Sequence, residues 1–162
     1  MIDLKIVVIV HSVTGNTKKL ADAIGDKAKA KGHSVSVVHL MTDPPIEGKG
    51  KDPKEFRITN LPNASSYDTI IIGCPVWGAN ITPVMKKALA EIKGLSGKRV
   101  IPFSSQAFPF AFLGGNRVLR LISKEAEAKG ARILPGSSIQ RMGRDLDKGI
   151  ERASNEIASR IQ

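Results

Sequence analysis

The sequence has few cysteines and histidines and lacks long apolar runs, and each shortage excludes a class of protein or site. Cys74 is the single cysteine, so no intramolecular disulfide can form, which fits a reducing compartment. The three histidines show no metal-site spacing with one another or with Cys74. No apolar stretch approaches the roughly 20 residues needed to cross a bilayer, and the N-terminus does not resemble a signal peptide. We therefore expect a soluble, cytoplasmic protein without a metal site.

Acidic residues are also scarce relative to basic ones. Lys and Arg number 25 against 15 Asp and Glu, which gives a formal net charge of +10. The basic residues are spread over every expected helix and form no tail or cluster with interleaved aromatics, so solvated helix faces explain them better than a nucleic-acid surface. With 162 residues, the chain is long enough for one core and too short for two ordinary domains. We expect a single domain over residues 1–162.

Apolar runs alternate along the chain with segments of helical periodicity. Strands are predicted at 4–10, 35–40, 68–73, 99–103 and 132–134, and helices at 17–31, 83–93, 116–129 and 146–161. Residues 42–66, rich in Pro, Gly and Lys, are expected to form a long surface connection with at most a short helix. Strands joined by crossover helices predict an α/β fold with a doubly wound, five-stranded parallel sheet. Ligands of such folds bind beyond the carboxyl ends of the strands.

A hydroxyl-rich turn, residues 12–17, joins the first strand to the first helix. Unpaired amides and the helix dipole favour an anion at this point, and the hydroxyl and amide side chains add donors. No Lys follows Gly15, as a nucleotide-triphosphate loop requires, and no Gly-x-Gly-x-x-Gly occurs. A single terminal phosphate ester therefore fits better than a polyphosphate. The alternative is an ordinary helix N-terminus capped by Thr14.

Two further loops, after the third and fourth strands, contain no charged residue. Residues 74–82 include the only Trp of the chain, Trp77, and residues 104–116 include three of its five Phe. Uncharged aromatic loops at the ligand-binding edge favour a flat apolar guest, with mutual packing or a protein interface as the alternative. Together the three loops predict a ligand with a phosphate at one end and a planar aromatic system at the other.

At these residues the sequence resembles the flavodoxin family. The turn at 12–17 is similar to that family's phosphate loop for FMN, residues 75–78 to its first flavin-ring loop, and residues 104–115 to its second. The resemblance implies a three-layer sandwich with strand order 2-1-3-4-5 and noncovalently bound FMN. The resemblance also implies the cofactor-binding residues. Those around the phosphate are Ser12, Val13, Thr14, Gly15, Asn16 and Thr17, and those along the ring are Pro75, Val76, Trp77 and Gly78. Backbone amides around 104–108, which include Ser104, Ser105 and Gln106, would reach the pyrimidine end of the ring, and Phe108 or Phe110 would close its other side.

The residues leave the role of the flavin open between two classes. In the first, the protein is an electron carrier that docks redox partner proteins. In the second, it is an enzyme that passes electrons from NAD(P)H to a quinone or similar acceptor. The basic composition departs from electron-carrying flavodoxins, and residues 108–116 look more like the branch of flavin-dependent reductases. A weaker alternative is a flavin-free protein-interaction module.

Three smaller expectations concern the surroundings of the ring. The ring loops lack carboxylates, and negative charge near a flavin disfavours its anionic reduced form, so we expect a less negative reduction potential than in acidic relatives. Cys74, at a strand end, is expected to be a packed apolar side chain rather than a reactive thiol. For His11, beside the phosphate loop, a structural role is favoured over ligand contact.

Overall fold

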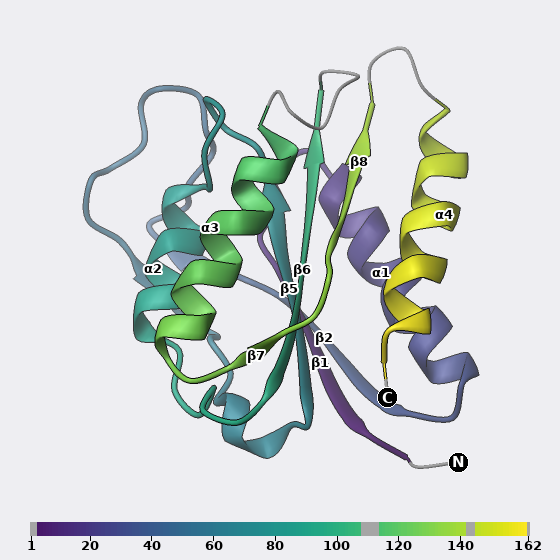
Figure 1. The fold of residues 1–162 in the computed structure, drawn as a ribbon. Helices are drawn as coiled ribbons and strands as arrows, with labels where there is room; N and C mark the ends of the chain where they lie inside the picture. Colours follow the sequence, from purple (N-terminus) through teal and green to yellow (C-terminus); the bar gives the residue numbers. More distant parts are fainter. Residues whose placement is uncertain (1–2, 108–113, 142–144, 162) are drawn as a thin grey trace.

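The computed structural model describes residues 3–107, 114–141 and 145–161, and shows a central sheet between two layers of helices (Figure 1). The strands of this sheet are β1 (Lys5–Val10), β2 (Ser34–His39), β5 (Thr69–Pro75), β6 (Arg99–Gln106), β7 (Arg132–Ile133) and β8 (Ser137–Gln140). All strand pairs in this sheet are parallel. The strand order is β2-β1-β5-β6-β7, and β8 also pairs with β6. The predicted α/β fold and its strand order are confirmed.

Within the described residues, four helices cover the two faces of the sheet. α1 (Asn16–Ala30) and α4 (Leu146–Ser159) lie on one face, and α2 (Pro83–Glu91) and α3 (Gly115–Ala128) lie on the other (Figure 1). Residues of β1 point alternately into two core clusters: Val7 packs toward α2 and α3, and Val8 toward α1 and α4. Burial on both faces explains why this strand is an almost unbroken apolar run. No helix in the described ranges is both long and apolar enough to span a membrane.

The outer edge of the sheet differs from the sequence prediction, which had one short strand at 132–134 and five strands in all. β7 and β8 both pair with β6 but are separated by residues 134–136, which include Pro135 and Gly136, so the sheet has six strands in the described part of the chain. Pro135 has no N–H to donate, and Gly136 lies so close to the carbonyl oxygen of Pro102 that a side chain would clash. Arg160 Nη1 donates to the carbonyl oxygens of Pro135 and Gly136, both at 3.0 Å.

The connection over residues 42–66 contains more order than expected. β3 (Thr42–Asp43) and β4 (Arg57–Ile58) form a separate antiparallel pair, and a 3-10 helix, η1 (Ala64–Ser66), follows. Between β3 and β4, the Asp52 carboxylate accepts hydrogen bonds from the backbone N–H groups of Glu47 and Gly48, both at 2.7 Å. These bonds fix the backbone of a turn that the sequence only marked as a surface connection.

Strand register brings the expected loops to one edge of the sheet. Val10 pairs with Gly73, Gly73 with Phe103, and Phe103 with Ser137, so these four residues form one row. The strands run in the same direction through this row, so the segments that follow β1, β5 and β6 leave the sheet at the same edge, the upper edge in Figure 1. Gly73 is required in this row because Phe103 packs directly over it and leaves no space for a Cβ.

Candidate functional site

The loops after β1, β5 and β6 meet around a pocket of about 160 Å³ at this edge. Seven predicted site residues line its described walls: Thr14, Asn16, Pro75, Val76, Trp77, Ser105 and Gln106. Six further predicted site residues are described but do not line the pocket: Ser12, Val13, Gly15, Thr17, Gly78 and Ser104. The last two, Phe108 and Phe110, lie outside the described residues. A larger groove of about 940 Å³ lies between α3 and β7, but none of the predicted site residues lines it.

The beginning of α1 lacks the cap that the alternative interpretation of the phosphate loop requires. Its N-cap is Gly15, at φ 95°, rather than Thr14, and within the described structure no side chain caps it. Ser12 Oγ accepts a hydrogen bond from the Gly15 N–H at 3.2 Å, which closes the turn before the helix. By contrast, the side chain of Thr82 caps α2 and that of Asp145 caps α4. The first-turn amides of α1 are therefore open to an external anion.

Thr17 connects the phosphate loop to the end of β6. The residue is 1% exposed, and its Oγ1 lies 2.6 Å from Ser105 Oγ in a hydrogen bond that either hydroxyl can donate. The sequence assigned this hydroxyl to the phosphate, and the structure shows it joining two of the three loops. This bond fixes the start of α1 relative to the neighbouring pocket wall.

Trp77 begins a tight turn in the loop after β5. Its backbone and that of Asn80 exchange two hydrogen bonds at 3.0 Å, while Gly78 and Ala79 adopt positive φ values of 56° and 61°. Positive φ at both central positions is the geometry of a type I′ turn. The indole packs against Gly48, where an added Cβ would lie 2.7 Å from two ring carbons. The 42–66 connection thus supports a ring-loop side chain, a contact between distant segments that the sequence did not indicate.

His11 holds Trp77 from a second direction. It is 4% exposed, its ring meets the indole edge to face with centroids 5.4 Å apart, and its Nδ1 lies 2.8 Å from Thr82 Oγ1. Burial lowers the pKa of His11 from 6.5 to about 4, although Asp52 acts in the opposite direction. The imidazole is therefore neutral near pH 7, and it links the indole to the first turn of α2, as the favoured structural role requires.

The end of β6 uses its polar side chains to hold neighbouring elements. Ser104 Oγ lies 3.3 Å from the carbonyl oxygen of Gly115 and 3.1 Å from Ser138 Oγ. Gln106 Oε1 accepts a hydrogen bond from the Gly115 N–H at 2.6 Å, which satisfies an amide at the start of α3. The resemblance placed backbone amides of this segment at the pyrimidine end, and the side chains of Ser104 and Gln106 are engaged inside the protein.

Four residues that were not among the predicted site residues complete the described walls: Ala107, Ile139, Arg141 and Leu146. Ala107 belongs to the loop already expected at 104–116, whereas the other three come from β8 and the start of α4. The sequence signal for β8 was hidden because Pro and Gly precede it. Arg141 is the only charged residue among the described wall residues, so the structure adds a cation to a pocket for which the sequence predicted none.

Cys74 and the histidines do not add a reactive or metal-binding group. Cys74 is fully buried, and burial raises the pKa of its thiol from 9.0 to about 12 although hydrogen bonding with Thr82 acts in the opposite direction. The thiol therefore behaves as the packed apolar side chain expected from its position. Within the described residues, no group of three or more His, Cys, Asp or Glu is arranged to hold a metal ion.

Comparison with known proteins places this geometry in a family. Residues 4–133 match the family model described as NADPH-dependent FMN reductase. An NAD(P)H dehydrogenase (quinone) of Archaeoglobus fulgidus is 31% identical over 121 residues, which cover 65% of this chain and 63% of that protein. The chain therefore spans less than two thirds of the length of this curated relative.

Solved structures show the same fold. A flavodoxin from the domain Archaea aligns with a TM-score of 0.68 and 22% identity, covering 96% of both chains. Oxidised flavodoxin 2 from Bacillus cereus aligns with a TM-score of 0.66 and 25% identity, covering 94% of both. The resemblance inferred from the three loops is confirmed by these matches and by the family model, which extends from β1 through β7. The chain belongs to the NADPH-dependent FMN reductase family and is a flavodoxin-like flavoprotein.

Proposed function

We propose that this chain binds FMN between its three loops and acts as an NADPH-dependent oxidoreductase that passes electrons to a quinone or similar small acceptor. When bound, FMN supplies the redox chemistry, accepting electrons from the nicotinamide and releasing them to the acceptor. The protein contributes binding, orientation and the electrostatic environment. The proposal assigns no catalytic side chain, and it places the protein in the cytoplasm because its only thiol is buried and has no disulfide partner.

The uncapped N-terminus of α1, in the wall of a pocket that also contains Trp77, carries this proposal. Open first-turn amides, together with Thr14 and Asn16 in the pocket wall, form a donor set suited to a phosphate ester. No carboxylate is among the described wall residues, so nothing in that part of the wall repels the anion. The donors and the absence of negative charge fit the phosphate end of FMN.

The other half of the pocket fits a flat ring. Pro75, Val76 and Trp77 supply an apolar wall, and Trp77 is only half-buried by its contacts with His11 and Gly48. The volume of about 160 Å³ is below the roughly 300 Å³ of a small ligand pocket. The described walls therefore enclose only part of an FMN-sized molecule. We expect the ring to lie along Trp77 with one edge in solvent, where NADPH or an acceptor can approach.

Three observations favour an enzyme over an electron carrier. The matching family model is described as NADPH-dependent FMN reductase, and the curated relative is described as NAD(P)H dehydrogenase (quinone). The net charge of +10 supports the same choice, because a positive surface attracts NADPH. An electron carrier is the second candidate, supported by flavodoxin structures that match over nearly the whole chain.

The test is a stopped-flow experiment without oxygen on the FMN-loaded protein. We expect NADPH to bleach the flavin absorbance at a rate on the order of 1–1000 per second, as in ordinary enzymes, and a quinone to restore it. Bleaching by dithionite but not by NADPH or NADH would contradict the enzyme and support the carrier. A colourless protein that does not respond to added FMN would exclude both.

A further inference from the structure

Among the described residues of the pocket wall formed by β8 and the start of α4, one is a cation, Arg141. We propose that Arg141 binds the phosphate of FMN and supplies the positive charge that the Ser12–Thr17 loop lacks. The inference rests on the proposed function, and it assigns a cofactor-binding role to a residue that lies far along the chain from the phosphate loop.

Backbone pairing fixes Arg141 on the side of the sheet that faces α1 and α4. Its N–H donates to the carbonyl oxygen of Gln106 at 3.0 Å, which continues the pairing of β8 with β6. Two residues earlier, Ile139 is 1% exposed and packs in the core cluster under α1 and α4. Alternate residues along an extended strand share a face. The Arg141 side chain therefore leaves β8 on the face from which α1 also approaches the pocket.

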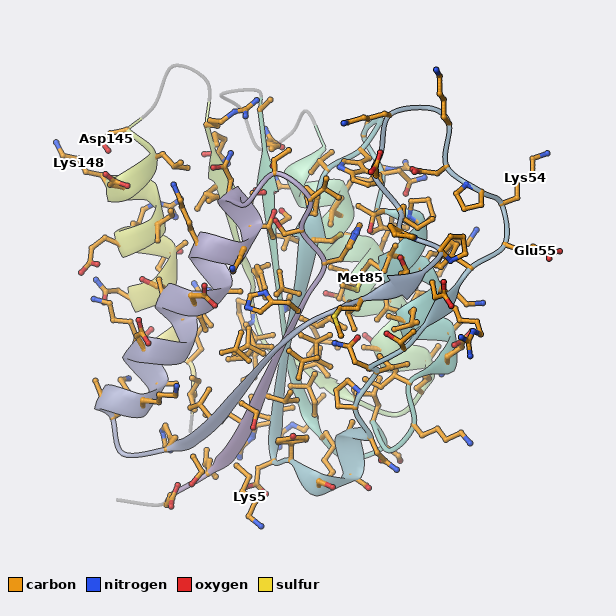
Figure 2. All side chains as sticks on the ribbon, turned by 180° about the vertical axis from the view of Figure 1, so that it is seen from behind. Lys5, Lys54, Glu55, Met85, Asp145 and Lys148 are labelled. Carbon is orange, nitrogen blue, oxygen red and sulfur yellow. The ribbon has the colours of Figure 1, made fainter. Side chains whose placement is uncertain are left out.

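The packing of α4 against α1 then places Arg141 and the phosphate loop around one pocket. The two helices lie side by side, with Ile24 and Ile157 in one core cluster (Figure 2). In Figure 2, Asp145 and Lys148 mark the first turn of α4, at the same end of the molecule as the beginning of α1. Arg141 accordingly lines the same pocket as Thr14 and Asn16, the residues on either side of the uncapped Gly15.

Among the described residues, Arg141 differs from Arg152 and Arg160 in having no side-chain partner. Arg152 pairs with Glu156 and also donates to the carbonyl oxygen of Ser138, and Arg160 donates to the carbonyl groups between β7 and β8. Within the described ranges the Arg141 side chain is exposed and makes no hydrogen bond or ion pair. A guanidinium without a partner, beside an open helix N-terminus, is suited to a phosphate dianion.

The test compares FMN with riboflavin, which lacks only the phosphate. For Arg141→Gln we expect the affinity for FMN to fall about tenfold, the loss of one charge-assisted hydrogen bond, and the affinity for riboflavin to stay unchanged. FMN binding by this variant should also depend less on salt concentration. Arg141→Lys, which keeps the charge, should retain most of the affinity. Arg120→Gln, the same charge change on the exposed side of α3, is the matched control and should bind FMN like the wild type.

Several outcomes would overturn the assignment. Unchanged FMN affinity in Arg141→Gln would contradict it, as would equal losses for FMN and riboflavin or an equal loss in the Arg120→Gln control. If the variant lost its preference for NADPH over NADH while FMN affinity stayed intact, the phosphate bound by Arg141 would be that of the substrate. A wild-type protein that binds neither flavin would overturn the proposed function itself, a result distinct from all of these. Far-ultraviolet circular dichroism establishes that each variant is folded.

Discussion

The contact between Gly48 and Trp77 can be tested by adding a single methyl group. In Gly48→Ala, the new Cβ would lie 2.7 Å from two indole carbons of Trp77, well inside van der Waals contact. The loop backbone cannot easily retreat, because the N–H groups of Glu47 and Gly48 are both held by the Asp52 carboxylate at 2.7 Å. We therefore expect the indole to move.

Gly50→Ala is a matched control for backbone strain. Gly48 and Gly50 have nearly equal φ values of 75° and 78°, but an added Cβ at Gly50 meets nothing within 4 Å. Positive φ costs about 1 kcal/mol for alanine in either position. Overpacking adds about 1–3 kcal/mol only at Gly48. The difference between the two variants therefore isolates the contact with Trp77.

Trp77 is the only tryptophan of the chain, so its fluorescence reports directly on this contact. Urea denaturation followed by Trp77 emission should show Gly48→Ala to be less stable than Gly50→Ala by about 1–3 kcal/mol. The emission maximum of the native state should shift in Gly48→Ala only, and this variant should bind FMN more weakly than Gly50→Ala. Equal stabilities and identical native emission in the two variants would refute the packing argument.

Three further predictions concern buried polar groups. Burial lowers the pKa of His11 from 6.5 to about 4, so between these pH values the unfolded state binds a proton that the folded state excludes. The free energy of unfolding should therefore fall by about 2 kcal/mol from pH 7 to pH 5. In urea titrations, His11→Gln should show a smaller fall over the same pH range. Cys74, with a thiol pKa raised to about 12, should not react with Ellman's reagent in the native protein but should react at once in urea; rapid labelling under native conditions would contradict its burial. A double-mutant cycle of Thr17→Val and Ser105→Ala should give a coupling free energy of about 1 kcal/mol, and additive effects would show that their bond does not stabilise the protein.

The sequence predicted the central fold because its main signal is local. Strands buried on both faces are continuous apolar runs, as at residues 6–10 of β1, and helices that cover a sheet show apolar stripes. β8 was missed because Pro135 and Gly136 are normally turn residues. Here they only interrupt an edge strand, where a missing donor is tolerated. The pairing that continues beyond them depends on the length of β6, which no local pattern in residues 132–140 reveals.

The candidate site was also predictable only where the signal in the sequence is local. The three loops were predictable because parallel strands place their carboxyl ends at one edge of the sheet. The contributions of Gly48 and Arg141 were not, since both arise from the packing of segments that are distant in sequence. The N-cap was misplaced by one residue in the alternative interpretation. Gly15 takes that position because its φ of 95° is accessible to glycine at little cost, and this change leaves the helix amides open.

A titration of the purified apoprotein with FMN tests the central claim most directly, because Trp77 and the phosphate loop share one pocket. The account predicts saturable binding of one FMN per chain with a dissociation constant of about 1 µM or lower, accompanied by quenching of both flavin and Trp77 fluorescence. Binding without any change in Trp77 emission would place the flavin elsewhere. No binding at FMN concentrations far above this value would contradict the account.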